Sequence, residues 1–171
     1  HTADPESVGM RGDLLPNLER DIAARYRSMT AFLVVRRGKL ICERYYGGFD
    51  QDDKHLVASV TKSFISALIG IAIDRGFIDD VDQRVLDYFP EYVPDSLDHL
   101  KLQITIRDFL TMTAGFQWRT GARNHELHID RLRRSKDWVA FILGLPVQER
   151  LLGTFQYNSA TSHLLSAIIT R

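Results

Sequence analysis

Cysteine, excess charge and long apolar runs are all scarce in this sequence. Its 171 residues include one cysteine, Cys42, which excludes an internal disulfide framework and a cysteine-based metal site and does not identify a cellular compartment. Lys plus Arg number 22 and Asp plus Glu number 22, so the net charge gives no reason to expect nucleic acid or an anionic membrane as a partner. No apolar run approaches the roughly 20 residues that span a bilayer. What remains is a globular domain, or part of one, acting on a small molecule or on another protein.

A helix and a β-hairpin are predicted in the first 50 residues. Four apolar residues recur at four-residue steps, which is typical of an amphipathic helix: Leu14, Leu18, Ile22 and Tyr26. Two runs rich in β-branched and aromatic residues flank Arg37-Gly38 and predict strands near 31–36 and 39–45. Cys42 stands in the second run, where we expect a small core residue.

A helix from about Ser59 to Arg75, ended by a left-handed Gly76, follows the hairpin. We expect its buried face to consist of Phe64, Ile65, Leu68, Ile69, Ala72 and Ile73. Irregular structure with one short helix around Val81–Tyr88 comes next.

Three further helices are predicted in the second half of the chain. Thr105 and Asp108 form a capping-box pattern for a helix that Gly115 would end. Ser135 is the expected N-cap of the next helix, with Pro146 just past its end. The segment "GTFQYNSA" predicts a tight loop that runs into a final helix.

Ser59 and Lys62 are the first candidates for chemistry. They stand three residues apart, so a helix places both side chains on one face, about one turn apart. A serine hydroxyl attacks a carbonyl usefully when a neighbour takes its proton. Either an uncharged Lys62 accepts that proton, or a charged Lys62 orients the hydroxyl while another residue does the proton work. The pattern Ser-x-x-Lys arises by chance about once in a chain of this length, but Lys62 also interrupts an otherwise apolar or small segment in a first helical turn, where the dipole disfavours a cation.

Tyr157, in "FQYNSA", is the third candidate, because a phenol near a lysine can shuttle a proton to a leaving group or activate water. Taken alone, a tyrosine packed at the start of a helix explains it more simply.

Four segments carry a resemblance to a known family: "ASVTKSF", "GFIDDVDQRVLDYFPEY", "ITIRDFLTMTAGF" and "GTFQYNSA". In this order and spacing, the chain resembles the serine β-lactamase and penicillin-binding-protein-like superfamily, and most of all its class C branch, which includes esterases and aminohexanoate-oligomer hydrolases. The resemblance implies an α/β (α+β type) fold with an antiparallel sheet flanked by helices and a mainly helical subdomain. It divides the chain into a helix and hairpin at 1–50 and a nucleophile helix with helical subdomain at 51–171.

The resemblance also implies roles for the candidate residues. Ser59 would be the acylated nucleophile and its backbone N–H one half of the oxyanion hole, Lys62 its base or orienting partner, and Tyr157 an assistant in proton transfer. Ser159 stands where the lactamases carry an asparagine that contacts the substrate, which makes Ser159 a substrate-binding candidate and lowers the expectation of lactamase action.

A second departure concerns the later part of the family pattern. The third motif, Lys-Thr-Gly or His-x-Gly, does not follow Tyr157, and "HLLSAIITR" stops at Arg171 within an apolar helical pattern. We therefore expect the N-terminal part of a domain about twice as long. The missing C-terminal half would be a second polypeptide, be removed by proteolysis, or be replaced by self-association.

The expected function is acyl transfer through a Ser59 acyl-enzyme to water, with carboxylic esters or small amides as substrates and with no metal or organic cofactor. One alternative is a β-lactamase or D-alanyl-D-alanine peptidase. Another is a sensor that stays acylated, or a structural protein on the same scaffold.

Three weaker signals favour structural explanations. "HELH" (125–128) lacks the His-Glu-x-x-His zinc spacing and is expected to be a solvated loop. "RLRRSK" (131–136) lacks the aromatic residues of a nucleic-acid site and is expected to be a solvated face before a helix. His163 is expected to have a structural role.

Overall fold

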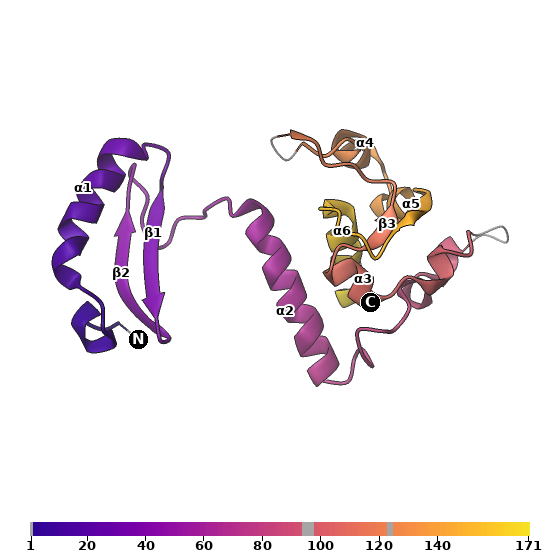
Figure 1. The fold of residues 1–171 in the computed structure, drawn as a ribbon, viewed down its shortest axis with the longest axis horizontal. Coiled ribbons are helices and arrows are strands. Elements are labelled where there is room, and N and C mark those ends of the chain that lie inside the picture. The colour runs from indigo at the N-terminus through magenta and orange to yellow at the C-terminus, as the bar shows by residue number, and fades with distance from the viewer. Residues whose placement is uncertain (1, 94–97, 123–124) are drawn as a thin grey trace. The chain divides into compact units, whose positions relative to one another are not determined.

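The computed structural model describes residues 2–93, 98–122 and 125–171. The chain divides into two compact units, His1–Val57 and Ala58–Arg171. Each unit combines helices with a pair of short antiparallel strands (Figure 1), which agrees with the expected α+β class. Within the described ranges, no helix has the length and apolar character needed to cross a membrane.

The first unit holds one helix and one hairpin. Helix α1 spans Leu15–Arg25, and strand β1 (Ala31–Arg36) pairs antiparallel with β2 (Lys39–Tyr45). These bounds confirm both predicted strands. At the turn, Arg37 and Gly38 have φ values of 50° and 73°, and two successive left-handed residues suit the twist of a tight hairpin.

The predicted apolar stripe of α1 is only partly buried. Ile22 is buried, as are Val8 and Cys42 of the same unit. The other stripe residues are exposed: Leu14, Leu18 and Tyr26. Leu14 and Tyr26 also lie just outside α1, as its flanking residues, so the predicted stripe is longer than the helix, and Ile22 is its one buried member.

The second unit begins with a 3₁₀ turn at Ala58–Val60, followed by helix α2 at Thr61–Asp74. Gly76 follows the helix with φ 73°, which confirms the predicted left-handed end. The start of the helix differs from the prediction, because Ser59 belongs to the 3₁₀ turn and Lys62 to the first turn of α2.

The apolar face of α2 is covered along one side, where it packs against α6 (Ser159–Ile169). Ile69 is fully buried there, and three of its neighbours are partly buried: Ile65, Ala72 and Ile73. The prediction is wrong for the other side of the face, since Phe64 is 63% exposed and Leu68 is 43% exposed.

The remaining elements of this unit pack around one core. They are α3 (Ile106–Leu110), β3 (Ala114–Phe116), α4 (Ile129–Arg134), α5 (Trp138–Leu143) and β4 (Val147–Leu152), with β3 and β4 antiparallel. Several of the core side chains are large and fully buried: Phe89, Ile106, Phe109, Trp118, Ile142 and Leu164. The short helix predicted around Val81–Tyr88 is a 3₁₀ turn at Val85–Tyr88.

The predicted capping box of α3 is confirmed. The Thr105 hydroxyl oxygen accepts from the Asp108 backbone N–H, and the Asp108 carboxylate accepts from the Thr105 backbone N–H. The predicted end of this helix is wrong, because α3 stops at Leu110 and Gly115 lies inside β3. The register of the β3–β4 pair shifts at Gly115, as a β-bulge does, and a bulge is the other common place for a glycine with positive φ.

The helix predicted at "SKDWVAFILG" has a different N-cap. The side chain of Asp137 accepts from the Ala140 N–H at 2.9 Å, whereas Ser135 follows the last residue of α4. Ser135 loses the capping position because "RLRR" is itself helical. The arginines of this segment are exposed and precede α5, as expected of a solvated face before a helix.

Candidate active site

Ser59 lies in the 3₁₀ turn at the entrance to α2, where its side chain is exposed. The residue before it, Ala58, has φ 43°, a left-handed conformation that costs an alanine roughly 1–2 kcal/mol. The turn also places Ser59 beside the N-terminus of a 14-residue helix, whose free N–H groups and dipole favour negative charge. Local structure thus presents the Ser59 hydroxyl to solvent at a position that stabilises a developing oxyanion.

Lys62 contacts the Ser59 hydroxyl from the first turn of α2. Its Nζ donates to Ser59 Oγ at 3.1 Å, and its side chain is half-buried. The three-residue spacing therefore brings the two groups together, although the first of them stands just outside the helix.

Tyr157 reaches the same oxygen from 98 residues further along the chain. Its hydroxyl donates to Ser59 Oγ at 2.5 Å, and Lys62 Nζ lies 5.0 Å from the centre of the Tyr157 ring. The Ser59 oxygen thus accepts hydrogen bonds from Lys62 and from Tyr157, and the three sequence candidates meet at one atom.

The surroundings of Tyr157 act on its acidity in both directions. Burial raises the pKa of Tyr157, but its hydrogen bond with Ser59 and the proximity and charge of Lys62 outweigh burial. The pKa of Tyr157 therefore lies below the ordinary value of a tyrosine. A phenol with this shift is a better proton acceptor at neutral pH than an isolated tyrosine, because more of it is phenolate.

Asn158 and Thr120 hold the backbone around Tyr157. Asn158 is the N-cap of α6, and its buried side-chain oxygen accepts from the backbone N–H groups of Ala160 and Thr161. The Thr120 hydroxyl donates to the Tyr157 carbonyl at 2.7 Å. Tyr157 is thereby fixed at the entrance of a capped helix.

Ser159, the substrate-binding candidate, is bonded within the protein. Its hydroxyl donates to Glu126 at 2.6 Å, and its backbone N–H donates to the other oxygen of the same carboxylate at 2.8 Å. Glu126 is buried, so the expectation of a solvated loop at 125–128 is wrong for this residue. No role of its own was predicted for Glu126. The one available signal in the sequence was an acidic residue in "HELH", eight residues after Trp118, and Trp118 donates to Glu126 in the structure.

His128 and His163 pack against aromatic rings, whereas His125 does not share this environment. His125 is exposed, and the ring of His128 lies 5.8 Å from that of Trp118. His163 stacks edge-on against Trp138 at 4.9 Å, and burial lowers the pKa of His163. Among the residues that the structure describes, no three His, Cys, Asp or Glu side chains form a group that could hold a metal ion.

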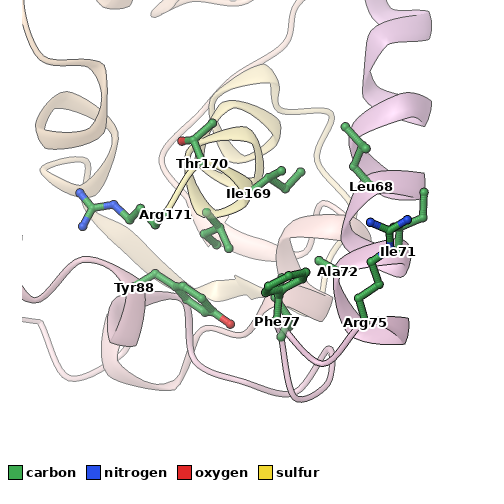
Figure 2. A pocket seen from close by; sticks show the side chains of 11 residues that line it. Leu68, Ile71, Ala72, Arg75, Phe77, Tyr88, Ile169, Thr170 and Arg171 are labelled. Carbon is green, nitrogen blue, oxygen red and sulfur yellow. The ribbon is translucent and has the colours of Figure 1, made fainter.

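A cavity of about 470 Å³ lies away from Ser59 (Figure 2). Its wall includes Leu68 and Ile71 of α2 and the residues that end α6, Ile169 to Arg171. Thr61 is the first residue of α2 and directly follows the turn that holds Ser59. Leu68 lies seven residues further on, which is about 10 Å along the helix axis. The cavity is therefore formed by the uncovered side of α2 and does not contain the Ser59 cluster.

Comparison with known proteins places the chain in a family. Residues 16–171 match the β-lactamase family. The 6-aminohexanoate-dimer hydrolase of Paenarthrobacter ureafaciens is 33% identical over an alignment of length 166, which covers 92% of this chain and 41% of that protein. The chain thus spans less than half the length of this curated relative.

Solved structures show the same fold. A Bacillus anthracis protein provisionally assigned as a 6-aminohexanoate-dimer hydrolase has a TM-score of 0.65 at 20% identity, over 89% of this chain and 42% of that one. A Bacteroides dorei protein provisionally assigned as a β-lactamase has a TM-score of 0.65 at 26% identity, over 92% and 44%. FmtA from Staphylococcus aureus has a TM-score of 0.64 at 14% identity, over 92% and 43%. These likenesses confirm the expected β-lactamase-like fold. The match over residues 16–171 shows that the chain belongs to the β-lactamase family.

Proposed function

We propose that the protein containing this chain is a serine hydrolase that cleaves carboxylic esters and small linear amides through a Ser59 acyl-enzyme. The observation that carries the proposal is the convergence of Lys62 and Tyr157 on the Ser59 oxygen, at 3.1 Å and 2.5 Å. The curated relative named as a 6-aminohexanoate-dimer hydrolase supports a linear amide as one substrate.

Tyr157 is the proposed base, with Lys62 as the group that keeps it acidic. The Tyr157 oxygen is the closer of the two to Ser59, and the pKa of Tyr157 is lowered despite burial that raises it. A lysine that stays charged beside the phenolate stabilises it by direct electrostatic attraction. This division of roles asks no proton transfer of Lys62 itself.

In acylation, the Tyr157 phenolate takes the Ser59 proton as the Ser59 oxygen attacks the substrate carbonyl carbon. The new O–C bond gives a tetrahedral oxyanion, which the Ser59 backbone N–H and the nearby N-terminus of α2 stabilise. The C–N or C–O bond to the leaving group then breaks, and Tyr157 returns the proton to the departing nitrogen or oxygen.

In deacylation, water takes the place of the leaving group. The water oxygen attacks the acyl carbon while Tyr157 accepts a proton from the water. Tyr157 then gives that proton to the Ser59 oxygen, which leaves the acyl carbon. The products are a carboxylic acid and the regenerated Ser59 hydroxyl, so the cycle needs no redox partner.

The test uses the full-length protein with a 4-nitrophenyl ester and with the linear dimer of 6-aminohexanoate. Ser59→Ala should lower kcat at least about a thousandfold, and intact-mass analysis of the wild type should find one acyl group, mapped by peptide digestion to Ser59. Ser63→Ala is the matched control, because Ser63 is exposed on α2, the helix that carries Lys62, and serves no step of the mechanism. Full turnover by Ser59→Ala, or an acyl group on another residue, would contradict the proposal.

The same assay separates the alternatives. Release of one equivalent of nitrophenol followed by no turnover would identify a sensor that stays acylated, and no release at all would identify a structural protein. A chromogenic cephalosporin consumed faster than the ester and the amide would identify a β-lactamase. We expect the ester and the amide to be hydrolysed faster than the cephalosporin. Ser159 stands where the lactamases carry a substrate-contacting asparagine, and its hydroxyl is bonded to Glu126.

A further inference from the structure

Glu126 accepts hydrogen bonds from two separate segments of the chain. The indole N–H of Trp118 donates to it at 2.5 Å, the Ser159 hydroxyl at 2.6 Å and the Ser159 backbone N–H at 2.8 Å. Glu126 is 8% exposed, and Trp118 is 2% exposed. A carboxylate removed from water is stable in the folded protein only when donors of this kind replace its hydration.

The residue that pairs with Glu126, Thr120, contacts Tyr157. Thr120 and Glu126 form an antiparallel bridge, and the Thr120 hydroxyl donates to the Tyr157 carbonyl at 2.7 Å. Thr120, on one side of this bridge, therefore holds the carbonyl of Tyr157. Glu126, on the other side, holds the N–H and hydroxyl of Ser159. The peptide between Tyr157 and the first residue of α6 is fixed at both ends.

We propose that Glu126 is a positioning residue, which acts through Ser159 to hold the Tyr157 hydroxyl on the Ser59 oxygen. This inference rests on the proposed function, because it gives Glu126 a part in the chemistry of Ser59 and Tyr157. It also makes Ser159 a link between Glu126 and Tyr157 and not a substrate contact, since both Ser159 donors are bonded to the carboxylate.

The size of the effect follows from the geometry. Tyr157 lies two residues before Ser159, and its backbone is held by Thr120 and through Ser159, so loss of the Glu126 bonds removes one of the two supports that place the Tyr157 hydroxyl on Ser59. A displacement of about 1 Å at a reacting group costs up to about a hundredfold in rate. Substrate binding is unaffected in this scheme, because Glu126 touches no reacting atom.

The main test is a double-mutant cycle in the full-length protein. Glu126→Ala should lower kcat about 30- to 100-fold with KM changed less than about twofold, whereas in a Tyr157→Phe background the same change should lower kcat less than about threefold. Multiplicative losses in the two backgrounds would overturn the proposal, because they would show that Glu126 acts independently of Tyr157.

Two further variants keep the test decisive where Glu126→Ala fails to fold. Glu126→Gln should keep at least about a third of kcat, because its amide oxygen can accept from Trp118 and the Ser159 N–H while its NH₂ donates to a rotated Ser159 hydroxyl. Ser159→Ala should lower kcat about threefold to tenfold with KM unchanged, and this loss should vanish with Tyr157→Phe. A raised KM with unchanged kcat for Ser159→Ala would show a substrate contact and overturn the inference.

The controls separate this proposal from the one on which it rests. Glu149→Ala removes an exposed carboxylate from β4 and should leave both constants unchanged. An inactive wild type, or an active Ser59→Ala variant, would contradict the proposed function. An active wild type that depends on Ser59 and Tyr157 but is indifferent to Glu126→Ala would overturn the role of Glu126 alone.

Discussion

Gly115 offers a quantitative test of the β3–β4 pair, which precedes the Tyr157 loop. It has φ 70°, and a Cβ built on it would lie 3.1 Å from the Leu152 backbone N and 3.2 Å from the Gln148 carbonyl oxygen. Gly115→Ala therefore combines two costs, about 1–2 kcal/mol for a left-handed alanine and about 1–3 kcal/mol for an atom forced against backbone that cannot rotate away. We expect the free energy of unfolding to fall by about 2–5 kcal/mol in total.

Gly76 is the matched control. Its φ is 73°, but a Cβ there would meet no atom within 4 Å. Gly76→Ala should cost about 1–2 kcal/mol, from the backbone conformation alone. The difference between the two variants is then the packing cost of the bulge in β3.

Urea unfolding of both variants in the full-length protein, followed by far-UV circular dichroism, measures the two values. Gly115→Ala should also lower esterase activity, because backbone bonds from Gly153 to Thr113 and from Gln156 to Met112 join this region to the Tyr157 loop. Equal losses of stability for the two variants would refute the reasoning, since they would show that the bulge accommodates a Cβ without strain.

Three other outcomes follow from the described contacts. Lys62 lowers the pKa of Tyr157, and the phenolate is the proposed active form, so the rate should rise with pH through that lowered pKa. Lys62→Gln should move this limb to higher pH in a pH–kcat profile, and an unmoved limb would exclude Tyr157 as the base. Burial lowers the pKa of His163, so the unfolded chain binds its proton first and stability should fall as the pH drops below about 6.5; His163→Phe keeps an aromatic ring against Trp138 and should lessen this loss in thermal melts at pH 5 and pH 8. Ala58→Val should be about 1–2 kcal/mol less stable in urea than Ala58→Gly, because a β-branched side chain tolerates φ 43° poorly, and equal stability would mean that this turn relaxes.

Local patterns predicted the hairpin and two helix boundaries correctly. The strands 31–36 and 39–45 depend on neighbouring residues and on a Gly-containing turn, and both are confirmed. The capping box of Thr105 and Asp108 and the left-handed Gly76 are short-range features as well. Ser59, Lys62 and Tyr157 were each found from residue type and motif, and the structure brings their side chains together.

Features that depend on distant partners were missed. A glycine with positive φ fits a helix end or a bulge equally well, and only the pairing of β3 with β4 decides for Gly115. Ser135 and Asp137 are both good N-caps, and the choice depends on where the preceding helix stops. The burial of Glu126 follows from contacts with Trp118 and Ser159, which no local pattern reports.

The meeting of Ser59 and Tyr157 has a consequence for how the second unit folds. The bond between them closes a loop of 98 residues, and the entropic cost of closing a loop grows with its length. Helices such as α2 need only local contacts. The bond between Ser59 and Tyr157 forms after the segments between these two residues have packed together. During refolding, the helical signal should therefore recover before Ser59 regains reactivity toward a fluorophosphonate probe. The reactivity of Ser59, the proposed nucleophile, would then report that the second unit has finished folding.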